Sequence, residues 1–176
     1  MSVSAVDLPK SSALWAHVQA GDFLDCYRAT AVPIELGMEE AVRTALNHMP
    51  GWVRWLMDIR NRIVGPLGLK AGKHSRKGEA GEDAPLEMSA PSERIVFTVR
   101  ERYENEIILG EDDRHLDFRV SVFRTPVAWY VATWVHPHAW YGWLYLYTIM
   151  PFHKAIMYLS ARRLEEVQRP LACDHL

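Results

Sequence analysis

The first half of the chain alternates between two kinds of hydrophobic spacing. Two serines at 11–12 stand before Ala13-Leu14-Trp15, and this pattern predicts a short N-capped turn of helix. Residues 22–31 then alternate with a period of two, which predicts a strand, although neither of its faces is uniformly apolar. Apolar side chains recur every three or four positions over 38–49 and again over 52–63. This spacing predicts two consecutive helices with a tight Pro-Gly corner between them.

The second half of the chain changes from strand spacing to helix spacing. Four segments have the period of two that is typical of strands: 94–103, 104–110, 115–124 and 127–136. Asn105 and the stretch Gly110–Asp113 have the chemistry of turns, and such short connections require antiparallel pairing. Residues 139–176 are expected to form mostly one long helix, which Pro151 should kink and which should end before Pro170. The sequence therefore predicts an antiparallel meander followed by a C-terminal helix.

A long connection separates the predicted helices from the meander. Residues 72–91 hold glycine and proline among charged and small side chains, without an apolar period, and this predicts a surface loop. Basic residues at 70–77 could bind phosphate, but acidic side chains at 79–83 follow and nearly cancel their charge, which favours a solvated loop. The length of 176 residues predicts one domain over 1–176, with its core at about 22–168.

The composition excludes several classes of protein. Hydrophobic residues make up 49% of the chain and charged residues 24%, which is enough apolar material for a folded core. The net charge of -2 provides no overall attraction to nucleic acid, so we expect no nucleic-acid partner. Cys26 and Cys173 match neither a CxxC metal motif nor a disulfide framework, and the first residues lack the pattern of a secretory signal. We therefore expect a cytoplasmic location.

One uncharged stretch raises the question of a membrane span. No Asp, Glu, Lys or Arg occurs between Arg124 and Lys154, a distance long enough to cross a bilayer. The stretch also contains His136, His138 and prolines, and its first third has strand spacing. Too few residues remain for an apolar transmembrane helix, so we expect no stable membrane span. A buried strand followed by the buried first half of a helix, or the wall of an aromatic-lined cavity, explains the stretch instead.

Three motifs carry a resemblance to known proteins. They are Val64-Gly-Pro-Leu-Gly-Leu-Lys70, Leu109-Gly-Glu-Asp-Asp-Arg-His-Leu-Asp-Phe-Arg-Val-Ser-Val122, and Gly142-Trp-Leu-Tyr145 followed by Pro151-Phe-His153. Together with their spacing they cover most of residues 22–163, and they resemble the family called domain of unknown function 2867. The order of the predicted elements resembles the START-like, or SRPBCC, superfamily, in which a curved sheet wraps around the last helix.

This resemblance implies an α+β helix-grip fold, with a curved antiparallel sheet around a long C-terminal helix and two short helices after the first strand. START-like proteins carry lipids, hormones or polyketides, and some of them cyclise or hydrate these molecules. We therefore expect a small hydrophobic or amphipathic ligand in a cavity between sheet and helix. A cyclase-like or hydratase-like enzyme and a structural or homodimerising module are the alternatives. No GxGxxG motif follows the first strand, so no nucleotide cofactor is expected.

Aromatic side chains in the last third of the chain are candidates for the wall of such a cavity. We assign Trp129, Trp134, Trp143 and Tyr145 to the wall and His153 to one polar contact with the ligand. Tyr145, His136 and His153 are the remaining cavity candidates, and their apolar sequence surroundings suit recognition of a ligand better than proton transfer. Pocket binding is therefore preferred over catalysis.

A polar stripe on one predicted strand supplies the candidates for catalysis. His115, Asp117, Arg119 and Ser121 share one face, opposite the apolar side chains that alternate with them. If the stripe faces solvent, Asp117 and Arg119 form an ordinary surface ion pair. If it lines the cavity, the same residues could bind a carboxylate or transfer protons. We favour the solvent-facing arrangement, which is usual for antiparallel sheets.

Two patterns that resemble metal sites have simpler explanations. His136, His138 and His153 could ligate a metal, but Pro137 interrupts the strand period and no carboxylate is near them in sequence, so structural roles are preferred. The acidic residues at 111–113 lack the EF-hand spacing and fit a charged hairpin turn. No GxSxG, HExxH or Walker motif is present. We expect neither a metal nor a cofactor.

Overall fold

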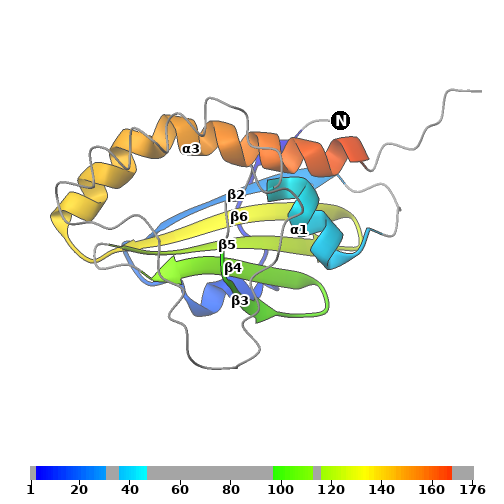
Figure 1. The fold of residues 1–176 in the computed structure, drawn as a ribbon, viewed down its shortest axis with the longest axis horizontal. Helices are drawn as coiled ribbons and strands as arrows, with labels where there is room; N and C mark the ends of the chain where they lie inside the picture. Colours follow the sequence, from blue (N-terminus) through cyan, green and yellow to red (C-terminus); the bar gives the residue numbers. More distant parts are fainter. Residues whose placement is uncertain (1–2, 31–35, 47–96, 113–115, 168–176) are drawn as a thin grey trace, which may run out of the picture.

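Within the described residues, six antiparallel strands form one curved, open sheet in the order β1-β2-β6-β5-β4-β3 (Figure 1). The strands are β1 (Ser4–Ala5), β2 (Phe23–Thr30), β3 (Val99–Arg102), β4 (Glu106–Asp112), β5 (Leu116–Thr125) and β6 (Ala128–Pro137). This computed structural model describes residues 3–30, 36–46, 97–112 and 116–167, without the side chains of Tyr141 and Tyr145.

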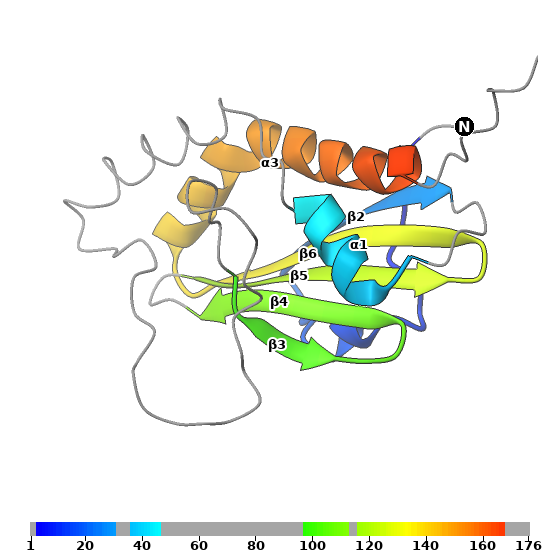
Figure 2. The same ribbon diagram turned by 45° about the vertical axis from the view of Figure 1, so that its right-hand side comes forward.

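One long helix crosses one face of the sheet. α3 (Trp140–Val167) bends as it passes over the strands, and α1 (Met38–Leu46) lies on the same face (Figure 1; Figure 2). Pro151 lies inside α3, where the absence of its backbone N–H removes one helical hydrogen bond and favours a bend. A 3-10 turn, η1 (Ala13–Ala16), precedes β2. The fold is therefore α+β, with the sheet and the C-terminal helix in a helix-grip-like arrangement.

Most of the predicted elements agree with the structure. The capped turn is present, because the hydroxyl of Ser12 accepts a hydrogen bond from the Leu14 amide at 3.2 Å. The first strand, the meander and the long helix lie where their periods place them. α3 ends at Val167, before Pro170. Local hydrophobic spacing was therefore sufficient to find these elements.

Other predictions differ from the structure or fall outside it. β4 extends to Asp112 and pairs Gly110 with Arg119, so the prediction that Gly110 belongs to a turn is wrong. β3 begins at Val99, later than its alternating pattern suggests, and residues 97 and 98 do not belong to it. The helix predicted at 52–63, the loop at 72–91 and the basic residues at 70–77 lie outside the described residues.

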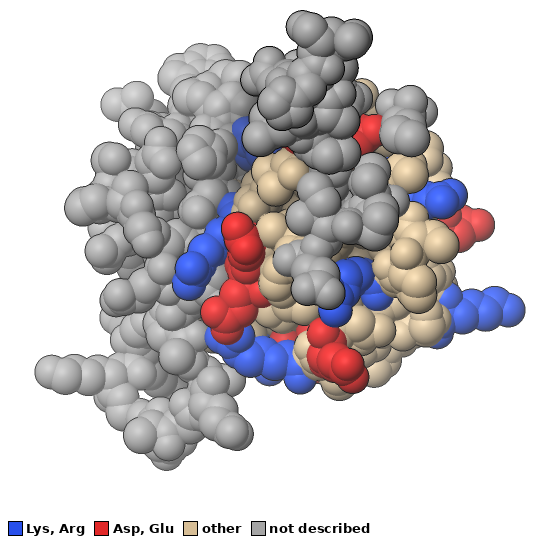
Figure 3. Space-filling view, turned by 90° about the vertical axis from the view of Figure 1, so that its right-hand side faces the viewer, with Lys and Arg blue, Asp and Glu red and all other residues tan. Residues whose placement is uncertain are grey.

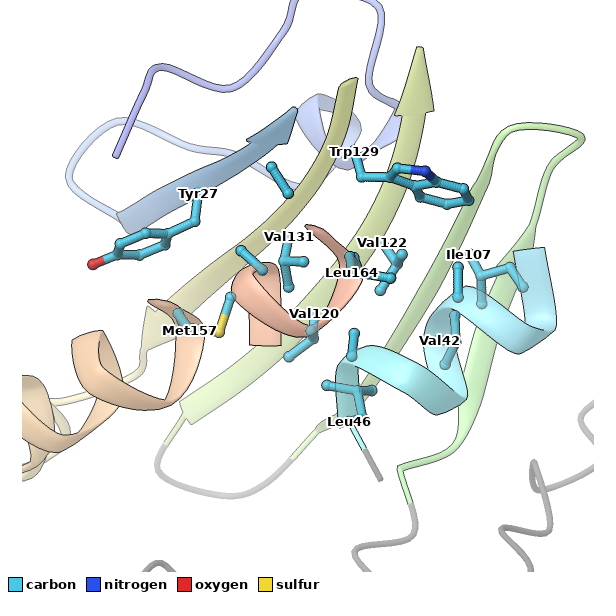
Figure 4. Close-up of a cluster of buried hydrophobic side chains, with 14 of the residues drawn as sticks. Tyr27, Val42, Leu46, Ile107, Val120, Val122, Trp129, Val131, Met157 and Leu164 are labelled. Atoms are coloured by element: carbon cyan, nitrogen blue, oxygen red, sulfur yellow. The ribbon is translucent and has the colours of Figure 1, made fainter. Parts of the chain in front are cut away.

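The helix face of the sheet, which is the face covered by α3 and α1, carries the main core. Side chains that alternate along the strands pack there against both helices (Figure 4). The labelled members of this core are Tyr27, Val42, Leu46, Ile107, Val120, Val122, Trp129, Val131, Met157 and Leu164. Removing an aliphatic side chain of this size from water contributes about 1.5 to 3 kcal/mol, so this layer holds the helices on the sheet.

The back face of the sheet, which is the face opposite α3, is covered by residues 6–18. We call this segment the N-terminal strap. Its apolar side chains, including the fully buried Leu14, pack against Ile108, Ala132 and Trp134 of the sheet. The strap therefore gives the sheet a second, smaller apolar layer.

A buried carboxylate anchors the strap. Glu106, at the start of β4, is 1% exposed. Its carboxylate accepts hydrogen bonds from the Ser12 hydroxyl at 2.7 Å, the Ala13 amide at 2.6 Å and the Ser121 hydroxyl at 2.5 Å. A buried carboxylate is tolerated when its oxygens are satisfied in this way. Glu106 therefore ties η1 to β4 and β5.

The uncharged stretch before Lys154 contains two elements that pack on each other, the whole of β6 and the first half of α3. The expectation that this half of the helix is buried was wrong for one of its sides. Trp140, Leu144 and Tyr147 are 75%, 60% and 68% exposed. Within the described residues, no helix combines the length and the apolar character needed to cross a membrane.

Charged side chains of both signs share the surface shown in Figure 3. Lys and Arg lie beside Asp and Glu on the described part of this end of the molecule (Figure 3). Ion pairs of this kind include Arg102–Glu39 at 2.5 Å and Arg162–Glu166 at 2.8 Å. Exposed pairs contribute about 0 to 1 kcal/mol each, so they influence solubility more than stability.

Candidate functional site

The polar stripe of β5 lies on the back face, away from α3. Asp117, Arg119 and Ser121 point to this side, whereas Val120 and Val122 belong to the core on the helix face. Solvent does not reach the whole stripe, because Ser121 is fully buried beside the strap and Arg119 is only 9% exposed. His115 is not among the described residues.

Asp117 and Arg119 contact other residues and not each other. Nη1 of Arg119 lies 2.6 Å from Oδ1 of Asp112 and donates a hydrogen bond to the Phe118 carbonyl at 2.9 Å. Burial opposes ionisation of Asp112, but the hydrogen bond and charge of Arg119 outweigh it and lower the pKa of this carboxyl. Oδ2 of Asp117 lies 3.0 Å from Nε2 of His138.

The carboxylate of Asp22 contacts three hydrogen-bonding groups on the back face. Its carboxylate accepts from Nε1 of Trp134 at 2.7 Å and from the Gln19 amide at 2.8 Å, and it lies 2.6 Å from Nδ1 of His136. Burial alone would raise the pKa of Asp22, but the hydrogen bonds from His136, Gln19 and Trp134 lower it. With Nδ1 facing a carboxylate, a neutral His136 carries its proton there and presents Nε2 as an acceptor.

These contacts predict that protonation of Asp22 destabilises the fold. Because its pKa is lower in the folded protein, Asp22 stabilises the fold fully above the ordinary value of 3.8, and this stabilisation is lost as the pH falls through the folded value. We expect the urea midpoint to fall between about pH 5 and about pH 2 in the wild type. The fall should be smaller in Asp22→Asn, which removes the titrating group but keeps its shape. Parallel curves for the two proteins would contradict this role.

A second pair of histidine and carboxylate lies on the helix face. Nε2 of His153, on α3, is 3.2 Å from each carboxylate oxygen of Asp25, on β2. Both side chains are 16% exposed. The His153 ring also meets the Phe23 ring edge-on, with 5.7 Å between the ring centroids. The pair therefore places polar chemistry inside the layer between sheet and helix.

The described side chains among the five predicted to line a cavity lie in different parts of the fold. Trp129 is 1% exposed in the main core, and Trp134 packs with the strap on the back face. Trp143 and His153 lie on the helix face: Trp143 packs on the cluster of Leu116, Val135 and Leu146, and His153 meets Phe23, which packs on the same cluster. The side chain of Tyr145 is outside the described part. Of the described residues in this set, only Trp143 and His153 occupy one region.

A partly covered apolar cluster surrounds that region, and we call it the end cluster. Three of its members are buried: Leu116, Val135 and Leu146. Five further apolar side chains around them, three of them aromatic, are only partly buried: Phe23, Phe118, Trp143, Ile149 and Met150. In the main core the balance is reversed, since only Met38, Phe97 and Phe118 are partly buried around a large buried set. Among the described residues, the layer is therefore well covered near α1 and incompletely covered where α3 begins.

The three histidines considered as metal ligands do not meet. His153 lies on the helix face, whereas His136 and His138 lie together on the back face with ring centroids 5.6 Å apart. Among the described residues, no group of three or more His, Cys, Asp or Glu side chains is arranged to hold a metal ion. Sequence reasoning missed Asp22 and Asp25 as partners of these histidines, because they are more than a hundred residues away along the chain.

Comparison with protein families completes the description of these sites. The model of the family described as protein of unknown function DUF2867 matches residues 18–160, which is most of the chain. The chain belongs to the DUF2867 family. The DUF2867 match includes Asp22, Asp25 and His153 but begins after the strap residues that contact Glu106. No curated protein and no solved structure shows a significant match to the chain.

Proposed function

We propose that this DUF2867 protein binds a small hydrophobic or amphipathic molecule between the sheet and the first half of α3. The end cluster carries the proposal, because it gathers five large apolar side chains that the described fold leaves partly exposed. Partly exposed apolar groups in one place are typical of ligand sites, and their burial by a ligand is favourable. The START-like relationship, which the element order supports, belongs to the same proposal.

The polar pair beside the cluster supports an amphipathic ligand. Asp25 and His153 adjoin Phe23 at the margin of the end cluster. Ligand sites commonly combine a mostly apolar wall with a few polar groups that fix the ligand's orientation. Trp143 and His153 keep their proposed roles in ligand binding, and Phe23 and Ile149 join them. Cys26, a buried free thiol, supports the cytoplasmic location that we also propose.

A filling substitution tests this site. Ile149→Trp adds volume inside the end cluster, whereas Leu144→Trp makes a comparable change on the exposed side of α3. With the neutral dye Nile red as the probe, we expect Ile149→Trp to weaken binding about tenfold or more, which is about 1.4 kcal/mol, and Leu144→Trp to change it little. Native mass spectrometry after mild purification should also show a bound small molecule in the wild type and less of it in Ile149→Trp.

The alternative functions predict different results in the same measurements. A wild type that binds neither dye nor co-purified molecule would support a structural or dimerising module and would overturn the proposal. If Ile149→Trp and Leu144→Trp changed the affinity for the dye equally, the dye would bind outside the end cluster. The cyclase-like or hydratase-like alternative relied on the stripe of β5, which stands on the other face of the sheet from the end cluster. We therefore assign no reaction to the end cluster.

A further inference from the structure

The carboxylate of Asp25 has an acceptor that its surroundings leave unused. His153 Nε2 is 3.2 Å from both oxygens, but only its contact with Oδ1 has the geometry of a hydrogen bond. Oδ2 is buried and has no hydrogen-bond donor in the described part of the chain. One N–H cannot form good hydrogen bonds to both carboxylate oxygens. Oδ2 therefore receives no hydrogen bond from His153.

A buried acceptor without a hydrogen bond destabilises the protein, and a molecule that brings a hydrogen-bond donor would remove this destabilisation. A buried polar group without a partner destabilises a folded protein, because it has lost its hydrogen bonds to water and gained none in return. Among the described residues, no neighbouring side chain donates to Oδ2: the hydroxyl of Thr133, which pairs with Asp25, donates to Sδ of Met157, and Phe23 presents a ring to His153. The negative charge of Asp25 is also felt nearby, since burial and then this charge raise the pKa of Tyr27. A donor brought by a ligand would be stabilised by Oδ2.

The partly covered side chains of the end cluster face the same layer as Asp25. Phe23 precedes Asp25 by two positions on β2 and therefore shares its face of the sheet. On α3, Ile149, Met150 and His153 follow at helical spacing and face the same layer. A molecule lying among the apolar side chains would thus have one end next to Asp25.

We infer that the ligand of this site carries a hydrogen-bond donor, an alcohol or an amine, which binds Oδ2 of Asp25, and that carboxylates are rejected. The inference rests on the proposed function and adds the chemical class of the ligand. A donor group fills the unused acceptor, whereas a carboxylate brings a second negative charge to a poorly hydrated place and leaves Oδ2 without a donor. His153 holds the carboxylate in position through Oδ1.

Three probes with one chain length test the inference: decan-1-ol, decylamine and decanoate. Calorimetric titration of the wild-type protein should give dissociation constants for the alcohol and the amine that are at least about tenfold lower than for decanoate. In Asp25→Asn, which keeps the shape but removes the charge, the preference should shrink to about threefold or less. Asp117→Asn makes the same change on the back face and should keep the wild-type preference.

The outcomes separate the two proposals. If the wild type binds none of the three probes, the proposed function fails. If it binds all three equally, or prefers decanoate, ligand binding stands and the inference about Asp25 is overturned. If Asp25→Asn does not fold, the wild-type ranking still decides for or against a donor-bearing ligand. The His153→Ala variant then provides a second measurement: it removes the only hydrogen-bond donor to Asp25 within the described residues, so the preference for the amine should strengthen, and an unchanged preference would count against the inference.

Discussion

Replacing Glu106 by alanine is expected to lower the free energy of unfolding by about 3 to 5 kcal/mol. The carboxylate is 1% exposed and accepts hydrogen bonds from Ser12, Ala13 and Ser121. The substitution leaves these donors without their acceptor and opens a small cavity between the strap and the sheet. Urea unfolding followed by tryptophan fluorescence measures the change.

Two further variants locate the origin of this loss. Glu104→Ala removes an exposed carboxylate from the same chain segment and should change stability by less than about 0.5 kcal/mol. Glu106→Gln keeps the shape and one acceptor oxygen, but its NH2 group would face donors, so an intermediate loss is expected. If Glu106→Ala were as mild as Glu104→Ala, the strap would not depend on this carboxylate.

The second large effect is expected from Gly110→Ala, with a loss of about 2 to 4 kcal/mol in the free energy of unfolding. A Cβ at this position would lie 2.1 Å from the carbonyl oxygen of Phe118 and 2.8 Å from Cδ of Arg119. The first neighbour is backbone of the paired strand, so the ladder between β4 and β5 must shift. Thermal unfolding by circular dichroism should show a clearly lower midpoint.

Gly37→Ala is the matched control for this substitution. Nothing lies within 4 Å of a Cβ at Gly37, so no displacement is needed. Glycine before α1 is a somewhat better helix cap than alanine, and a loss below about 1 kcal/mol is expected. Equal losses for the two variants would mean that backbone freedom, and not space, explains the effect at Gly110.

Gly110 also shows why sequence patterns gave the elements but not their details. A glycine followed by acidic residues has the chemistry of a turn, and that interpretation placed the end of β4 too early. In the structure the glycine is required by β5, since the backbone carbonyl of Phe118 lies in the space that a Cβ would occupy. The hydrophobic pattern around Gly110 does not reveal a requirement for glycine that comes from the neighbouring strand.

Alternation along a strand predicts which face of the sheet each side chain points to. For two tryptophans of β6 this information was available from the sequence but was not applied. Trp129 and Trp134 are separated by an odd number of positions on β6, so a regular strand must point them to opposite faces. The structure places them in the helix-face core and beside the strap, respectively. Counting positions would have removed one of the two from the predicted wall.

The sequence could not predict which charged residues contact each other when they lie on different strands or helices. Alternation correctly put Asp117 and Arg119 on one face, but Arg119 binds Asp112 on β4 and Asp117 contacts His138. The register between strands decides these contacts, and register depends on turns and packing. Asp25 and His153 are an extreme case, since they lie on different elements at 128 positions' separation.

The strap has a practical consequence for anyone who cuts this protein into fragments. A recombinant fragment that begins at residue 18, where the family match starts, would lack Ser12, Ala13 and Leu14. It would leave Glu106 with one of its three donors and uncover the apolar back face around Ile108. Such a fragment should aggregate even though it contains every residue that the family signature recognises. We therefore expect the segment needed for folding to be longer than the segment that the family model matches.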